Sequence, residues 1–166
     1  MSGKGMGGHQ SRTMEKDEWL TPPEILEALG PFDLDPCAPI KRPWSMAEKH
    51  YTKEDNGLFL PWEGRVWCNP PYLRREWRWL EKCAFHGNAI ALTFARTETA
   101  QFFKQVWGKA DGLLFIKERL HFYDVDGNRS NWNAGAPSVL VAYGDNNVES
   151  LRTSGITGAL VEVWGV

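Results

Sequence analysis

The feature that most restricts the fold of this chain is an alternation of short apolar runs with segments of helical periodicity. Residues 64–68 and 88–94 have the composition of buried strands, and the second is a continuous strand-like run that is mostly apolar. Residues 72–87 and 97–110 repeat apolar side chains at helical spacing, and we expect Thr97 to cap the second helix. Because buried strands that alternate with such helices form βαβ units, the sequence predicts an α/β fold with a mostly parallel sheet.

The two ends of the chain add weaker elements to this pattern. Residues 21–30 predict a helix with Thr21 as its cap, Pro22 in its first turn and Gly30 at its end. Residues 119–123 and 137–144 have no long helix between them, so we expect them to form an antiparallel pair at the sheet edge. A short helix within 146–155 and a last strand within 158–165 complete the prediction.

Length and composition indicate one globular domain. We predict a disordered arm over residues 1–16, which are polar and rich in glycine, and a single domain over residues 17–166. The chain has no apolar run of membrane-spanning length, and we expect no membrane association. Its formal net charge of -2 argues against bulk coating of nucleic acid but leaves room for a local basic groove.

The cysteines predict neither a disulfide framework nor a metal site. There are three of them, without a CxxC pair, which suits free thiols in a reducing cytoplasm. Cys83 and His86 are three residues apart, but nothing nearby completes a set of four ligands. We therefore predict no metal.

Polar residues follow the strand-like segments at two places. Asp35-Pro36 ends an apolar run, and residues 67–72, WCNPPY, follow another. Two successive prolines remove two backbone donors and make the chain locally rigid, which is more than a simple turn requires. Since ligands of open α/β sheets bind at the carboxyl ends of strands, both places are candidate site segments.

Several segments, in order along the chain, resemble the phage and prophage type of DNA N6-adenine methyltransferase. These segments are DEWLTPPEILEALGPFDLDPCA, WCNPPY, LTFARTET, FIKERLHF and PSVLVAYG. The resemblance extends from about residue 17 to residue 143. It implies a single Rossmann-like class I methyltransferase domain, S-adenosyl-L-methionine as cofactor, double-stranded DNA as partner and no obligate protein partner.

In such an enzyme the NPPY segment, Asn69, Pro70, Pro71 and Tyr72, is the catalytic motif. The Asn69 side-chain oxygen and the Pro70 carbonyl would accept hydrogen bonds from the two N–H groups of the adenine amine and favour its developing positive charge. Tyr72 would stack on a base flipped out of the duplex. A rigid turn before the following helix explains the asparagine and one proline, but not the whole motif.

The resemblance also implies a cofactor site, although the glycine-rich turn of most methyltransferases is absent. Its residues would be Trp19, Thr21, Pro22, Asp35, Pro36, Cys37 and Ala38. Asp55 is a further candidate, as an acceptor for adenine or ribose, and it suits a helix cap equally well. For Asp35, a plain Asp-Pro turn also remains open.

For DNA, the resemblance aligns Arg96 and Arg119 with arginines of the family, and phosphate contact is the functional interpretation. A solvated charge remains open for both. Residues 124–136 form a polar loop long enough to suspect a function. Its Asn128, Arg129 and Asn131 carry amide and guanidinium groups of the kind that read base edges.

Alternative functions share the same motif. Methylation of an RNA adenine or of a protein glutamine uses an NPPY core, and a catalytically silent nucleic-acid-binding relative is a further alternative. Cytosine C5 methylation is disfavoured because Pro36-Cys37 is followed by Ala38 rather than glutamine. The expected location is the cytoplasm of a bacterial host, with a phage or prophage as the source.

Overall fold

The computed structural model describes residues 18–71 and 76–164, so the predicted arm over residues 1–16 lies outside the described residues. The elements, in chain order, are α1 (Pro23–Leu29), β1 (Leu34–Asp35), β2 (Lys49–His50), β3 (Val66–Cys68), α2 (Glu76–His86), β4 (Ala89–Phe94), α3 (Ala100–Phe102), the π-helical turn η2 (Phe103–Trp107), β5 (Gly112–Ile116), β6 (Ser138–Tyr143), α4 (Asp145–Thr153) and β7 (Gly158–Glu162). None of the described helices is long and apolar enough to cross a membrane.

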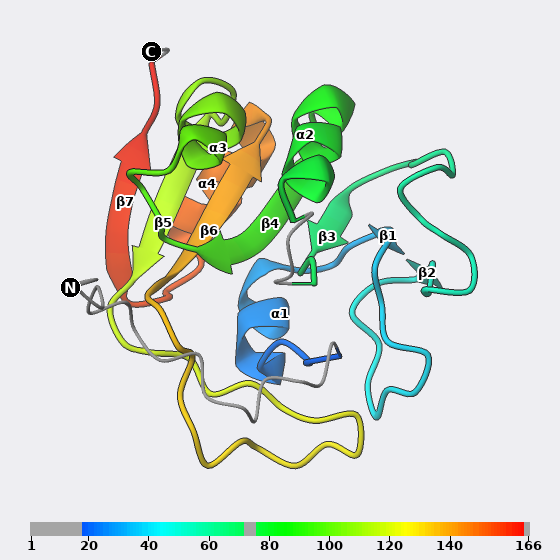
Figure 1. The fold of residues 1–166 in the computed structure, drawn as a ribbon. Helices are drawn as coiled ribbons and strands as arrows, with labels where there is room; N and C mark the ends of the chain where they lie inside the picture. Colours follow the sequence, from blue (N-terminus) through cyan, green and yellow to red (C-terminus); the bar gives the residue numbers. More distant parts are fainter. Residues whose placement is uncertain (1–17, 72–75, 165–166) are drawn as a thin grey trace, which may run out of the picture.

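The strands form one seven-stranded sheet in the order β2-β1-β3-β4-β6-β5-β7 (Figure 1). The first four strands of this order run parallel to one another. Strand β6 is antiparallel to both of its neighbours, β4 and β5, and β7 is antiparallel to β5 at the edge. The predicted α/β fold with parallel strands and added antiparallel ones is confirmed, but three strand pairings are antiparallel where the sequence predicted a single antiparallel edge strand.

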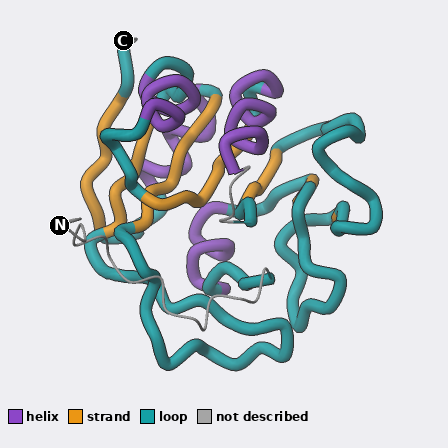
Figure 2. The backbone as a smooth tube through the Cα atoms, viewed as in Figure 1, coloured by secondary structure: helices purple, strands orange, loops and turns teal. Residues whose placement is uncertain are grey.

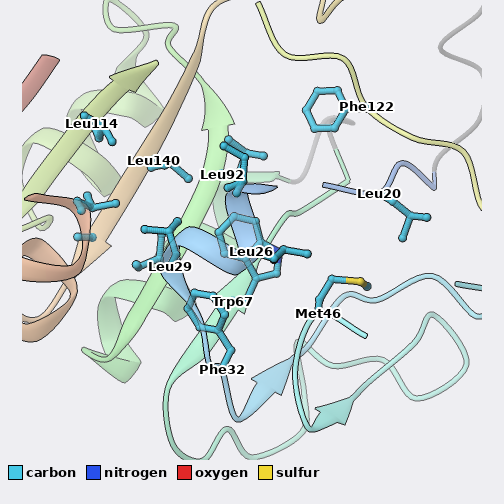
Figure 3. Packing of buried hydrophobic residues seen from close by; sticks show 14 of the residues in the cluster. Leu20, Leu26, Leu29, Phe32, Met46, Trp67, Leu92, Leu114, Phe122 and Leu140 are labelled. Atoms are coloured by element: carbon cyan, nitrogen blue, oxygen red, sulfur yellow. The ribbon is translucent and has the colours of Figure 1, made fainter. Parts of the chain in front are cut away.

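Two apolar layers hold the helices against the sheet. Successive strand residues point to opposite faces, so Trp67 packs with α1 and α4 while its neighbour Cys68 packs with α2. Figure 3 shows the first layer, with Leu29 of α1 and Leu92 of β4 close to Trp67. In the second layer, Cys83 of α2 is fully buried. The sheet is therefore covered by helices on both faces.

The predicted pairing of residues 119–123 with residues 137–144 is wrong. Residues 138–143 form β6, which is buried along its whole length and lies inside the sheet between β4 and β5. Within residues 119–123, Tyr123 instead forms isolated bridges with Leu20 and Arg129. An apolar strand gains most by being covered on both faces, which explains why β6 is internal.

The predicted helix caps were also wrong. The N-cap of α1 is Pro22, with no side-chain cap, and Thr21 precedes it. Helix α3 begins after Thr99, whose hydroxyl oxygen accepts a hydrogen bond from the Phe102 N–H at 3.2 Å. Thr97, the predicted cap, lies two residues earlier and its carbonyl accepts from the Trp107 indole.

Most of the irregular chain gathers at one edge of the sheet. Strands β1, β3 and β4 are parallel, so their carboxyl ends share this edge. Figures 1 and 2 show α1 and the long loops 36–48 and 117–137 beyond it. The segments that follow β1, β3 and β4 begin with Pro36, Asn69 and Ala95, which brings the predicted site segments together.

Candidate active site

Asp35 lies at the end of β1 with 3% of its surface exposed. Its side-chain Oδ1 accepts a hydrogen bond from the Cys37 N–H at 3.0 Å, and its carbonyl accepts from the Tyr51 N–H at 2.9 Å. Burial raises the pKa of this carboxyl group to about 7, while the Cys37 hydrogen bonds and the charge of Arg42 oppose the increase. Asp35 is therefore a buried acid that changes charge near neutral pH.

Cys37 connects this turn to the segment after β3. Its Sγ donates to the carbonyl of Asn69 at 3.3 Å and lies 3.8 Å from the Sγ of Cys68. Burial raises the pKa of the Cys37 thiol to about 11, so the thiol keeps its proton and acts as a donor at neutral pH. All three cysteines are free thiols, as predicted.

Asn69 is held from the other side by the N-terminal segment. Its Nδ2 donates to the carbonyl of Trp19 at 3.2 Å. This bond fixes the plane of the amide and therefore the direction of its side-chain oxygen. Pro70 is buried and Pro71 is half-buried. Tyr72, the last residue of the predicted motif, lies outside the described residues.

Two further predicted residues carry buried polar atoms on the segment whose Trp19 carbonyl binds Asn69. The Trp19 Nε1 and the Thr21 Oγ1 have no hydrogen-bond partner within residues 18–71 and 76–164. A buried polar group without a partner costs about 1–3 kcal/mol. A polar ligand bound at this segment would supply these partners. Pro22 and Ala38, which were predicted with them, are both buried.

His50 is a candidate that the sequence did not reveal. It pairs in register with Asp35 on the neighbouring strand β2, and its buried Nε2 finds no partner in the part of the chain that the structure describes. Burial lowers the pKa of this imidazole, with a further contribution from Arg42, so it is neutral at physiological pH. Strand β2 has only two residues, which gives no periodic signal in the sequence.

Asp55 lies in an exposed turn. Its Oδ2 accepts hydrogen bonds from the Thr52 N–H at 2.8 Å and from the Thr52 hydroxyl at 3.0 Å. These bonds lower the pKa of the Asp55 carboxyl group, and the bond from the Thr52 backbone N–H contributes most. The observed contacts are those of a residue that stabilises its own turn.

The loop after this turn is bound tightly between α2 and the Asp35 turn. Lys82 of α2 donates from its Nζ to the carbonyls of Gly57, Leu58 and Leu60, at 3.3, 2.7 and 2.6 Å. A Cβ atom at position 57 would lie 2.0 Å from the Pro36 carbonyl oxygen. Only glycine fits there. Gly57 is therefore the only residue of this loop by which the sequence could have indicated its close packing against Pro36.

The predicted phosphate contacts occupy different environments. Arg96 is exposed just beyond β4, where its guanidinium lies 5.8 Å from the centre of the Phe94 ring. Its charge opposes the burial that raises the pKa of Glu76, at the start of α2. Arg119 donates to the Ala134 carbonyl at 3.0 Å, so its side chain braces the long loop.

The other predicted DNA-binding residues lie in that loop. Asn128 donates from Nδ2 to both carboxylate oxygens of Asp124, at 3.4 and 3.3 Å, and so closes a turn. Arg129 forms the bridge with Tyr123, while its side chain is exposed. Asn131 is exposed as well. Arg129 and Asn131 are thus accessible to a partner, and Asn128 is engaged locally.

The geometry therefore joins a buried acidic turn to an asparagine with a fixed amide at one edge of an α/β sheet. Such an arrangement can orient a group that has N–H bonds to donate, next to a ligand that needs buried polar partners. Among the described residues there is no group of metal-binding side chains.

Comparison with known proteins agrees with this chemistry. The sequence profile described as DNA N-6-adenine-methyltransferase (Dam) matches residues 8–155, which is most of the chain. Comparison with curated proteins and with solved structures gave no match. The fold, the linked Asp35 and Asn69 segments and the extent of the profile lead to one conclusion: the chain belongs to the DNA N-6-adenine-methyltransferase (Dam) family and is a DNA adenine-N6 methyltransferase.

Proposed function

We propose that this enzyme has a Rossmann-like class I methyltransferase domain and transfers the methyl group of S-adenosyl-L-methionine to an adenine that is flipped out of duplex DNA. The observation that carries the proposal is the hydrogen bond from the Cys37 thiol to the Asn69 carbonyl, at 3.3 Å. It brings the acidic turn after β1 into contact with the NPPY segment, where cofactor and amine must meet.

The residues that would hold the cofactor are those with buried polar atoms near this contact. S-adenosyl-L-methionine, when bound, supplies a methyl group on a positively charged sulfur. Asp35, in its ionised form, would attract the positive charges of the cofactor. The Trp19 Nε1 and the Thr21 Oγ1, which lack partners among the described residues, would donate to its acceptor groups. Asp55 makes contacts within its own turn and remains the weakest member of the predicted set.

The adenine amine would be oriented by acceptors of the NPPY segment. The Asn69 Nδ2 donates to the Trp19 carbonyl, and this bond sets the direction of the Asn69 side-chain oxygen, the first acceptor. The Pro70 carbonyl would be the second acceptor. Both oxygens favour the positive charge that develops on the amine nitrogen as it attacks. The stacking role of Tyr72 rests on the sequence motif, because this residue lies outside the described ones.

The DNA would lie along the edge where the loops gather. Arg96 and Arg129 are exposed cations for its phosphates, and Asn131 offers an amide for a base edge. Arg119, which binds the Ala134 carbonyl, would act mainly by bracing the loop. On the resemblance to phage enzymes, we take the setting to be the cytoplasm of a bacterial cell.

A methylation assay tests the proposal. Purified protein is incubated with labelled S-adenosyl-L-methionine and with duplex DNA, single-stranded DNA or RNA of the same random-sequence pool. We expect label in the duplex, recovered as N6-methyladenine, and methylation-sensitive sequencing then gives the recognised site. Label that enters RNA or single-stranded DNA preferentially would contradict the duplex substrate.

Replacing Cys37 with alanine should lower the single-turnover methylation rate about 2- to 10-fold. The loss corresponds to one hydrogen bond of ordinary strength, here the bond that holds the Asn69 carbonyl. Cofactor affinity should change less, because the backbone N–H that binds Asp35 remains. Cys37→Ser keeps a donor and should recover part of the rate.

The matched control for this variant is Cys83→Ala. Cys83 is a fully buried thiol of the same apolar layer, on α2. Its replacement should reduce stability and leave the rate constant of the folded enzyme unchanged. Equal rate losses for the Cys37 and Cys83 variants would show that the thiols contribute only to packing.

A further inference from the structure

Trp132 is a large apolar side chain displayed on the returning arm of the long loop, after the turn that the Tyr123–Arg129 bridge closes. Its relative exposure is 71%. The residues on either side are anchored: the Ser130 N–H donates to the Phe122 carbonyl at 2.8 Å, and the Ala134 N–H donates to the Leu120 carbonyl at 2.6 Å. Residues 131–133, which we call the loop tip, thus project between two fixed points.

The loop tip is coupled to the catalytic asparagine through backbone hydrogen bonds. Leu20 and Tyr123 exchange two of them, at 2.8 and 3.1 Å. The residue before Leu20 is Trp19, whose carbonyl accepts from the Asn69 amide. The residue before Tyr123 is Phe122, whose carbonyl accepts from the Ser130 N–H, so a continuous chain of contacts leads from Asn69 to the loop tip.

A second set of contacts braces the same loop against residues 39–48. The Tyr123 ring meets the Trp44 ring edge-on, with 5.3 Å between their centres. Lys41 forms an ion pair with Asp126, and a Cβ atom at Gly127 would lie 3.1 Å from the Pro43 side chain. The loop tip is therefore supported by contacts with residues 39–48, at the end of the sheet where the candidate active site lies.

The surroundings of Trp132 identify the kind of partner. Its neighbours Asn131 and Asn133 are polar and exposed, and Arg129 nearby is an exposed cation. A single flat aromatic side chain among amides and an arginine is poorly suited to an apolar protein interface. It matches a stack of bases bordered by phosphates, into which apolar side chains insert as wedges.

We propose that Trp132 enters the base stack of duplex DNA and fills the space left by the adenine that is flipped toward Asn69. This inference rests on the proposed function and adds a residue that extrudes the target base. An indole has the thickness of a base and offers a stacking surface on both sides, so it offsets part of the unstacking cost. The Arg129 charge would hold the adjoining backbone.

Fluorescence of 2-aminopurine at the target position tests this inference, after the recognised site has been mapped with the wild-type enzyme. The fluorescence increases when the base leaves the stack. Trp132→Ala should lose most of this increase and lower the single-turnover rate about tenfold, whereas Trp132→Phe should retain both. A duplex with an abasic position opposite the target adenine should restore the Trp132→Ala rate, because the unpaired adenine is already loosely held.

Phe85→Ala provides the matched control. Phe85 is an aromatic residue with 93% relative exposure near the end of α2. Its neighbour His86 bonds to the Gly64 carbonyl, which precedes β3, so Phe85 lies at the opposite edge of the sheet. Its replacement should leave flipping and rate unchanged.

The outcomes separate the inference from the proposed function. Wild-type activity with a Trp132→Ala variant that flips the base normally would overturn the wedge and leave the proposed function intact. An equal rate loss on normal and abasic duplexes would also overturn it, since Trp132 would then be an ordinary binding contact. If the wild type methylates no duplex, the proposed function itself fails.

Discussion

Asn69→Ala is expected to slow the methyl-transfer step by about 10²–10³, the usual loss when one preorganised polar group is removed from a reacting centre. The Asn69 amide is oriented by its hydrogen bond to the Trp19 carbonyl at 3.2 Å. Its oxygen should matter most when the amine nitrogen becomes positive, so affinity for DNA and cofactor should change much less than the rate. Single-turnover kinetics with enzyme in excess measures this step directly.

Two further variants sharpen this prediction. Asn69→Asp keeps an acceptor oxygen and should be faster than the alanine variant, although it loses the donor to Trp19. Asn146→Ala, on an exposed position of α4, controls for the loss of an asparagine and should keep full activity. Tyr72→Phe should also remain active because it keeps the stacking ring. If Tyr72→Phe lost more rate than Asn69→Ala, the phenol would act chemically and the acceptor mechanism would be wrong.

The sequence predicted elements well where a single pattern determines them. Strand β4 is a mostly apolar run that is typical of a strand covered on both faces, and α4 has an amphipathic pattern of ordinary length. The position of β6 inside the sheet was not predictable in the same way. It depends on pairing with β4 and β5, which are separate in the sequence. The apolar pattern of a strand shows that it is buried but does not show which strands it pairs with.

The candidate site shows the same division. Placing Asp35 and the NPPY segment at one edge required only the rule that ligands bind at the carboxyl ends of parallel strands. The bonds from Cys37 to Asn69 and from Asn69 to Trp19 join residues 32 and 50 positions apart, and no local pattern encodes them. His50 was missed for a related reason, because β2 is too short to produce a periodic signal.

Asp35→Ala is expected to weaken binding of S-adenosyl-L-methionine by about 1–3 kcal/mol, or roughly 5- to 150-fold in the dissociation constant. Asp35 is almost fully buried at the end of β1, and its removal would leave the Cys37 N–H without its acceptor. In the proposed site, the positive charges of the cofactor would lose a buried anion. Isothermal titration calorimetry of the purified variant measures the change.

The same carboxyl group should make binding depend on pH. Burial raises its pKa to about 7, so it is largely protonated at pH 6 and ionised at pH 8. A positively charged ligand favours the ionised form, and affinity should therefore rise with pH, by up to about tenfold per unit below pH 7. Arg42 carries a constant charge and should not produce this increase. Burial lowers the pKa of His50, which moves its titration away from pH 7.

Stability of the ligand-free protein should change in the opposite direction. The folded state holds the Asp35 proton up to about pH 7, whereas an unfolded aspartate releases it near its ordinary pKa of 3.8. The stabilising contribution is thus complete below about pH 4. It decreases by up to about 1.4 kcal/mol per pH unit between the two pKa values and is lost once the pH has risen through 7.

Asp35→Asn removes both pH dependences at once, because an amide keeps the shape of the side chain and does not titrate. Urea unfolding of the ligand-free protein and calorimetry with the cofactor, each from pH 5.5 to 8, should give flatter curves for this variant than for the wild type. Opposite slopes in the wild type, one for binding and one for stability, identify a buried acid that is ionised by its ligand. If the wild-type affinity were constant over this range, Asp35 would serve only as a turn residue, and the cofactor would have to find its counter-charge elsewhere.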